Sequence, residues 1–179
     1  MRLYSVSDEY IAYLRVKYPR VYSNKEDIRT HTRKYLGVVL KIDDYNFYIP
    51  LSSPKKHDYI TINGEDVIRK DSLIVLRIVS SKAGKTELKG TLQIGTMIPV
   101  PDSEIQLYDV DSEPDQAYKD LVEEELIYIR KNEEKIKKNA RVLYSKKKAG
   151  NNENSVIASC VNFVELCSEC DRWISAHKA

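Results

Sequence analysis

The chain has 179 residues, enough for one domain with a hydrophobic core. Hydrophobic residues make up 42% of it and charged residues 31%, a balance that excludes wholesale disorder. No apolar run approaches the roughly 18 residues that span a bilayer. The first ten residues lack the apolar stretch of a secretory signal, and an odd number of cysteines, three, suits a reducing compartment. We therefore expect a cytoplasmic protein without a membrane partner.

The net charge of +2 hides an uneven distribution of basic and acidic residues. Bases dominate residues 15–34, lysines enrich residues 131–148, and residues 102–125 are acidic. Thirteen tyrosines occur beside two phenylalanines and one tryptophan, and several lie among the N-terminal bases. Lysine and arginine bind phosphates and aromatic rings stack on bases, so this mixture favours single-stranded RNA. The alternative is that the charged runs are solvated faces and most tyrosines are half-buried structural residues.

The first third of the chain predicts a strand, a helix and a β-hairpin. Alternation over residues 2–6 indicates a strand, and Ser7 is a suitable cap for a helix over 8–18 that ends before Pro19. Residues 19–34 are polar and without pattern, which predicts a long basic loop. The segments "YLGVVLKI" and "YNFYIPL" indicate two strands joined by a tight turn at Asp43-Asp44.

Further strand signals follow up to residue 110. Asn63-Gly64 is a favoured two-residue turn between the short segments 59–62 and 65–68. Residues 72–80 are a strong β run, residues 81–90 indicate a polar turn, and 91–100 and 104–110 are two more strand candidates. Two prolines, Pro99 and Pro101, indicate an edge position for the first of these candidates.

The second half of the chain changes to helical spacing. Residues 115–150 predict helix, which Asn132 can divide in two, and residues 155–178 predict a final helix after a polar linker. We therefore expect an α+β fold in a single domain, 1–179. A compact, strongly bent antiparallel sheet would occupy about 1–112 and a mostly helical part about 113–179.

Three patterns that resemble ligand sites fail on inspection. Gly84-Lys85-Thr86 resembles the end of a P-loop, but the required upstream glycine falls at Val79. The alternating acidic residues of 109–115 have Pro114 where a calcium loop needs glycine. The C-terminal cysteines fall partly on an apolar helix face, which disfavours zinc. We expect no metal site and no cofactor.

The segment "PLSSPKKHDY", residues 50–59, leaves a strand with two hydroxyls, a proline and two lysines. Ser52-x-x-Lys55 imitates an acylating serine motif, but that chemistry needs the serine at a helix start, and here a strand precedes it. Pro54 stiffens the loop, so Lys55 and the hydroxyls can clamp a phosphate and stabilise the charge of a five-coordinate intermediate. Such turns are also common at strand ends, and a purely solubilising role stays open.

Longer stretches of the sequence resemble one family. The segments "YSVSDEYIAYLR", "YLGVVLKIDDYNFYIPLSSPKK", "GTLQIGTMIPVP" and "YKDLVEEELIYIRKNEEKI" are similar in order and spacing to the ToxN/AbiQ family. The resemblance covers residues 1 to about 145, and the last thirty residues match no pattern of that family. It implies a compact barrel like that of the MazF and CcdB toxins, elaborated with helices.

The resemblance also implies an activity and a partner. Members of this family are metal-independent endoribonuclease toxins of type III toxin–antitoxin systems, used in abortive infection against phage. A small repeat RNA antitoxin inhibits the toxin, is cut by it into units, and assembles with it into a closed ring. We accordingly expect cellular or phage RNA as substrate, no DNA partner, and attack by the RNA 2′-hydroxyl to give a 2′,3′-cyclic phosphate. The alternative is a non-catalytic RNA-binding regulator.

The family motif places the predicted site on the loop of residues 52–56. By resemblance, Ser53 and Lys55 lie at the scissile phosphate and Ser52 supports them. Arg33 falls where a relative carries lysine, and its guanidinium is a good phosphate ligand but a poor proton donor. His57 replaces an aromatic residue, and stacking or phosphate contact is favoured over acid–base work. The predicted RNA-binding residues are Arg33, Lys34, Lys56, His57, Arg29 and Tyr10, with Arg29 at a position where some relatives carry tyrosine.

Overall fold

The computed structural model describes residues 1–24, 31–82, 84–150 and 154–177. Its strands are β1 (Arg2–Val6), β2 (Tyr35–Ile42), β3 (Tyr45–Ser52), β4 (Tyr59–Ile62), β5 (Glu65–Ile68), β6 (Leu76–Lys82), β7 (Lys85–Leu92), β8 (Ile98–Pro99) and β9 (Ile105–Leu107). Its α-helices are α1 (Asp8–Lys17), α2 (Gln116–Lys131), α3 (Glu133–Lys148), α4 (Ser155–Ala158) and α5 (Phe163–Ala176). Short 3₁₀ turns cover Lys56–Asp58, Ile94–Thr96 and Asp102–Glu104.

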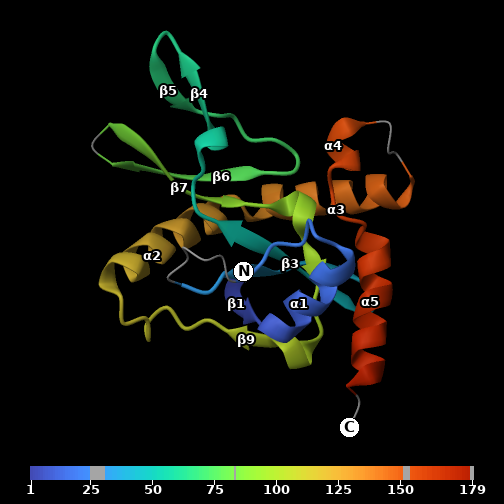
Figure 1. Cartoon of the computed structure of the whole chain (residues 1–179). Helices are drawn as coiled ribbons and strands as arrows, with labels where there is room; N and C mark the ends of the chain where they lie inside the picture. The colour runs from blue at the N-terminus through green and yellow to red at the C-terminus, as the bar shows by residue number, and fades with distance from the viewer. Residues whose placement is uncertain (25–30, 83, 151–153, 178–179) are drawn as a thin grey trace.

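One antiparallel sheet organises the molecule (Figure 1). Its strand order is β6-β7-β3-β2-β1-β9, and β8 pairs with β3 on the edge opposite β2. The hairpin β4–β5 forms a separate two-stranded sheet that projects from the body. The α+β class and the antiparallel sheet are thus confirmed. Within the described ranges no pairing joins the edge strands β6 and β9, so the expected closed barrel is not confirmed.

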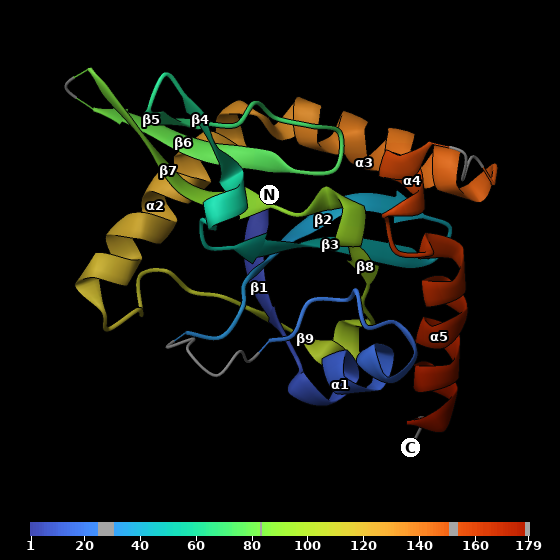
Figure 2. The same cartoon turned by 45° about the horizontal axis from the view of Figure 1, so that its top comes forward.

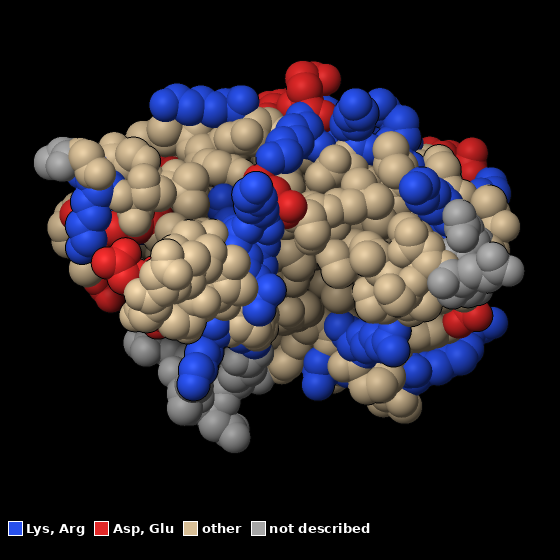
Figure 3. All heavy atoms as spheres, turned by 90° about the horizontal axis from the view of Figure 1, so that it is seen from above, with Lys and Arg blue, Asp and Glu red and all other residues tan. Residues whose placement is uncertain are grey.

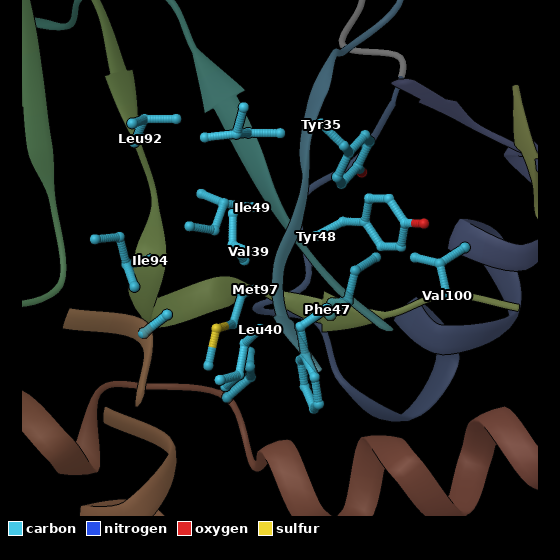
Figure 4. Close-up of a cluster of buried hydrophobic side chains, with 14 of the residues drawn as sticks. Tyr35, Val39, Leu40, Phe47, Tyr48, Ile49, Leu92, Ile94, Met97 and Val100 are labelled. Carbon is cyan, nitrogen blue, oxygen red and sulfur yellow. The ribbon is translucent and has the colours of Figure 1, made fainter. Parts of the chain in front are cut away.

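The core lies where β2 and β3 meet the C-terminal helices. β3 has an almost continuous buried run that includes Phe47, Tyr48 and Ile49, because both of its faces are covered. Figure 4 shows these side chains gathered with those of β2 and of the segment after β7. α2 packs against β6 and β7, α3 against β2, and α5 against β8. Figure 2 shows α3 running along the sheet and α5 at its end.

Several predicted elements are confirmed at their ends. Ser7 Oγ accepts a hydrogen bond from the Tyr10 N–H and caps α1. Positive φ angles of 52° at Asn63 and 83° at Gly64 form the predicted turn of the β4–β5 hairpin. The long helical region divides at Asn132 as predicted, but the Asn132 side chain donates to the Tyr128 carbonyl and does not cap α3.

Strand pairing changes one predicted element, and a local helix cap changes another. The segment 81–90, predicted as a polar turn, is mostly strand, since β6 and β7 pair residue by residue as far as Lys82 and Lys85. The predicted final helix over 155–178 is broken into α4 and α5. Asn162 accepts a hydrogen bond from the Glu165 N–H there and begins a new helix.

Candidate active site

The predicted catalytic loop leaves the sheet at the end of β3. Ser52 is the last residue of that strand and is only 3% exposed, whereas Ser53, Pro54 and Lys55 are exposed. The Ser52 carbonyl accepts a hydrogen bond from the Thr91 hydroxyl of β7 at 3.3 Å. The strand pair therefore fixes Ser52 and presents Ser53 and Lys55 outward.

The loop is closed by Asp58, which sequence reasoning missed. Its carboxylate accepts the Lys55 N–H at 3.0 Å, and the Asp58 N–H donates to the Lys55 carbonyl at 2.8 Å. The Asp58 carbonyl in turn accepts a hydrogen bond at 2.8 Å from the N–H of Arg69, the residue after β5. These bonds hold the backbone of residues 55–58 in one conformation, so the Lys55 side chain starts from a fixed point.

A buried arginine on β6 balances the Asp58 charge. Arg77 Nη2 lies 3.1 Å from Asp58 Oδ1, and the two side chains are 9% and 2% exposed. Arg77 also donates Nη1 to the Lys70 carbonyl, and its N–H donates to the Asp71 carboxylate. Separating this pair would leave an uncompensated charge in a buried position, which is costly. The pair therefore holds the loop against β6.

The Tyr22 ring lies between two cations of the predicted site. Arg33 Cζ is 4.5 Å and Lys55 Nζ is 5.7 Å from the ring centroid, within cation–π range. Arg33 is fully buried, and its guanidinium donates to the carbonyls of Ser23 and Leu51. Arg33 thus joins the basic loop to the end of β3, and its predicted contact with RNA would require that side chain to become exposed.

Lys34, just before β2, lies near the serines of the loop. Its Nζ is 4.0 Å from the centroid of the Tyr108 ring, and burial lowers its pKa. It lines a small cavity of about 40 Å³ together with Ser52, Ser53 and other residues of β7 and α2. The fold therefore brings Lys34 next to the serines of the loop, as the prediction of a shared basic site requires.

The remaining predicted residues have different positions. Lys56 and His57 are exposed beside the loop, and His57 Nε2 is 4.0 Å from Asp58. Tyr10 is fully buried, donates its hydroxyl to the Pro99 carbonyl and packs on Trp173. This position leaves no surface of Tyr10 for the predicted contact with RNA. Arg29 lies outside the described residues.

Figure 3 shows lysines and arginines in a central column and along the margins of one face, with some acidic side chains beside the column and at the upper and left margins. Such a surface suits a polyanion. Among the residues described, no cluster of three or more histidine, cysteine or acidic side chains is arranged to hold a metal ion. In the same part of the chain, every helix is too short or too polar to cross a membrane.

The missed residues share one property: each acts through a partner distant in sequence. Asp58 needs Arg77 of β6, and Tyr22 needs the side chains of Arg33 and Lys55. The sequence does show Asp58 directly after a short basic run, but this pattern does not reveal Arg77 as its partner.

The comparisons with known proteins agree with this fold. A family model described as "Toxin ToxN, type III toxin-antitoxin system" matches residues 2–170. The chain therefore belongs to this toxin family, as the sequence motifs indicated.

Individual relatives include two curated enzymes and solved structures. The chain is 36% identical over 146 residues to endoribonuclease AbiQ of Lactococcus lactis subsp. lactis, covering 82% of this chain and 75% of AbiQ. It is 27% identical to endoribonuclease ToxN of Pectobacterium atrosepticum, covering 76% of this chain and 75% of that protein. The structure of AbiQ, a lactococcal anti-phage endoribonuclease, matches with a TM-score of 0.78 at 30% identity, over 97% and 98% of the two chains. A structure from work on a processed non-coding RNA that regulates a bacterial antiviral system matches with a TM-score of 0.81 at 24% identity, over 96% and 98%, and shows the fold alone.

Proposed function

We propose that this chain is a sequence-selective endoribonuclease, the toxin of a type III toxin–antitoxin system that acts against phage infection. One observation carries the proposal: exposed Ser53 and Lys55 lie on a loop whose backbone is fixed by the buried carboxylate of Asp58. Donors held in place before the reaction stabilise developing charge more strongly than mobile ones. The relatives named endoribonuclease support RNA cleavage as the activity.

The proposed reaction is a transesterification within the RNA strand. The 2′-oxygen attacks the adjacent phosphorus and the P–O5′ bond breaks, leaving a 2′,3′-cyclic phosphate and a 5′-hydroxyl. The 2′-hydroxyl loses its proton and the 5′-oxygen gains one, so the protein must neutralise charge and move protons. Lys55 supplies the positive charge, Ser53 donates a hydrogen bond to the phosphate, and Ser52 supports them. Because the substrate carries its own nucleophile, the step needs no metal ion.

We propose a repeat RNA antitoxin as the regulating partner. A solved relative concerns toxin inhibition by a non-coding RNA pseudoknot, and the site of Ser53 and Lys55 in this chain would bind such an RNA and cleave its precursor into units. Lys34, Lys56 and His57 lie around the loop and are the proposed phosphate or base contacts. The closed ring of toxin and RNA stays a prediction from the family resemblance.

The test is cleavage of RNA by the purified chain with excess chelator, followed by sequencing and end-group analysis of the products. We expect cleavage at an unchanged rate, at a short preferred sequence, with 2′,3′-cyclic phosphate and 5′-hydroxyl ends. Adding the repeat RNA should inhibit the reaction.

Two outcomes would overturn parts of this proposal. Products with 3′-hydroxyl and 5′-phosphate ends, or complete loss of cleavage with chelator, would exclude the transesterification without metal. Tight RNA binding with no cleavage, and growth arrest that survives loss of the site lysine, would favour the non-catalytic regulator.

A further inference from the structure

A buried carboxyl group lies directly behind the proposed catalytic loop. Glu125 of α2 is only 8% exposed, on the helix face that also buries Val122 and Ile129. Over the described ranges its carboxyl group has neither a hydrogen bond nor an ion pair. A buried carboxyl without a partner is costly in its ionised form, and burial raises the pKa of Glu125 to about 8.

The backbone of β7 is shaped to receive this group. The Glu125 Oε1 lies so close to Gly90 that a Cβ at that position would collide with it. The same Cβ would lie 3.4 Å from the Ser52 carbonyl oxygen. Glycine therefore allows the carboxyl to approach the point where β3 ends and the catalytic loop begins.

Glu125 and Ser53 line one small cavity. Its volume of about 40 Å³ is enough for a small polar group such as a ribose or phosphate oxygen. The cavity thus has a buried lining residue, Glu125, and an exposed one, Ser53 of the loop. The other lining residues are Lys34, Leu51, Ser52, Lys89, Tyr118 and Leu121.

The charged residues around this cavity are engaged elsewhere. Lys89 of β7 pairs with Glu87 at 3.1 Å and with Glu124 at 3.1 Å. Lys34 has its ammonium over the Tyr108 ring, and the remaining titratable group of the lining, Tyr118, is a phenol. Within the described part of the chain, burial alone raises the Glu125 pKa, and neither Lys34 nor Lys89 pairs with its carboxyl group. The group is therefore held mostly as a neutral acid near pH 7.

We propose that Glu125 is the proton donor to the leaving 5′-oxygen in the reaction assigned to this site, an inference that rests on the proposed function. As the P–O5′ bond breaks, the carboxyl proton moves to the 5′-oxygen, and the carboxylate left behind takes a new proton from water. The 2′-hydroxyl proton passes to solvent. Arg33 is unsuited to this role, because its guanidinium is buried and holds its protons too firmly.

The test compares two RNA substrates with the full chain and its Glu125→Gln variant. On ordinary RNA the variant should cleave about 100-fold more slowly than wild type, the usual effect of losing a general acid. On RNA with sulfur in place of the scissile 5′-oxygen the two proteins should cleave at similar rates, because a thiolate leaves without a proton. Glu123→Gln, an exposed carboxyl on the same helix turn, is the matched control and should cleave both substrates like wild type.

The pH dependence gives a second readout. Wild-type cleavage of ordinary RNA should fall as pH rises through about 8, where Glu125 loses its proton, and Glu125→Gln should lack this fall. The buried neutral carboxyl of Glu125 also makes its full contribution to stability at pH values below about 4.5, the ordinary pKa of glutamate. This contribution is lost as the pH rises through about 8, the pKa in the folded protein. The melting temperature of Glu125→Gln should therefore depend less on pH in this window.

Specific results would overturn the inference. Wild-type rates for Glu125→Gln on ordinary RNA, or a defect that persists on the sulfur-containing RNA, would show that Glu125 is not the proton donor. A second variant, Gly90→Ala, displaces the same carboxyl from β7 and should repeat the pattern of loss and rescue. If wild type cleaved neither RNA, the proposed function itself would fail, which is a different result.

Discussion

Replacing Lys55 by alanine is expected to lower the rate of RNA cleavage by about 100- to 1,000-fold, the usual cost of removing one preorganised charge-stabilising donor. The expected loss is large because the Lys55 backbone is fixed on both sides: its N–H and carbonyl are bonded to Asp58. Only the Lys55 side chain, and not its backbone, must then be ordered when a phosphate arrives. Single-turnover cleavage of a labelled RNA measures the rate, and a binding titration measures affinity separately.

The matched control is Lys41→Ala. It removes the same charge from an exposed position on β2, near the turn into β3 and away from Ser52, and should keep the wild-type rate. For Lys55→Ala we expect a large loss of rate with a small loss of affinity, because the lysine acts mainly on charge that appears in the transition state. Equal losses of affinity and rate would instead make Lys55 a simple RNA-binding residue.

Local chemistry was enough to predict the elements whose ends carry strong signals. The cap at Ser7, the turn at Asn63-Gly64 and the break at Asn132 each depend on one or two neighbouring residues. The strand β7 was missed because "KTELKG" is polar, and only its pairing with β6 and β3 makes it a strand. Its polar residues mostly point outward, whereas Thr91 and Leu92 at its end are buried.

The site shows the same division between local and long-range information. The stiff loop of Ser53 and Lys55 is a local feature, and the structure exposes both residues. Asp58 and Glu125 were missed, since one depends on an arginine of β6 and the other on a glycine of β7. Periodicity in the sequence identifies a buried helix face, but it does not say that a carboxyl on this face lies behind a loop formed some seventy residues earlier.

Replacing Asp58 by alanine is expected to lower the free energy of unfolding by about 3–5 kcal/mol, the usual effect of breaking a buried ion pair. Arg77 would be left buried without its partner, and its Nε already has no hydrogen-bond partner within the described chain. Urea denaturation measures this loss. Asp66→Ala is the matched control, since this carboxylate is exposed on β5 and, among the described residues, its side chain bonds only the Thr61 hydroxyl; we expect a change within about 0.5 kcal/mol.

The double variant Asp58→Ala with Arg77→Leu separates stability from catalysis. Removing both charges should recover most of the lost free energy of unfolding, because no buried charge then remains uncompensated. Cleavage should stay low, since the Lys55 N–H still lacks its acceptor and the loop is no longer closed. A double variant that regained the wild-type cleavage rate would show that the Asp58 carboxylate serves the fold alone. A stable but slow double variant would place Asp58 as the residue that positions Lys55.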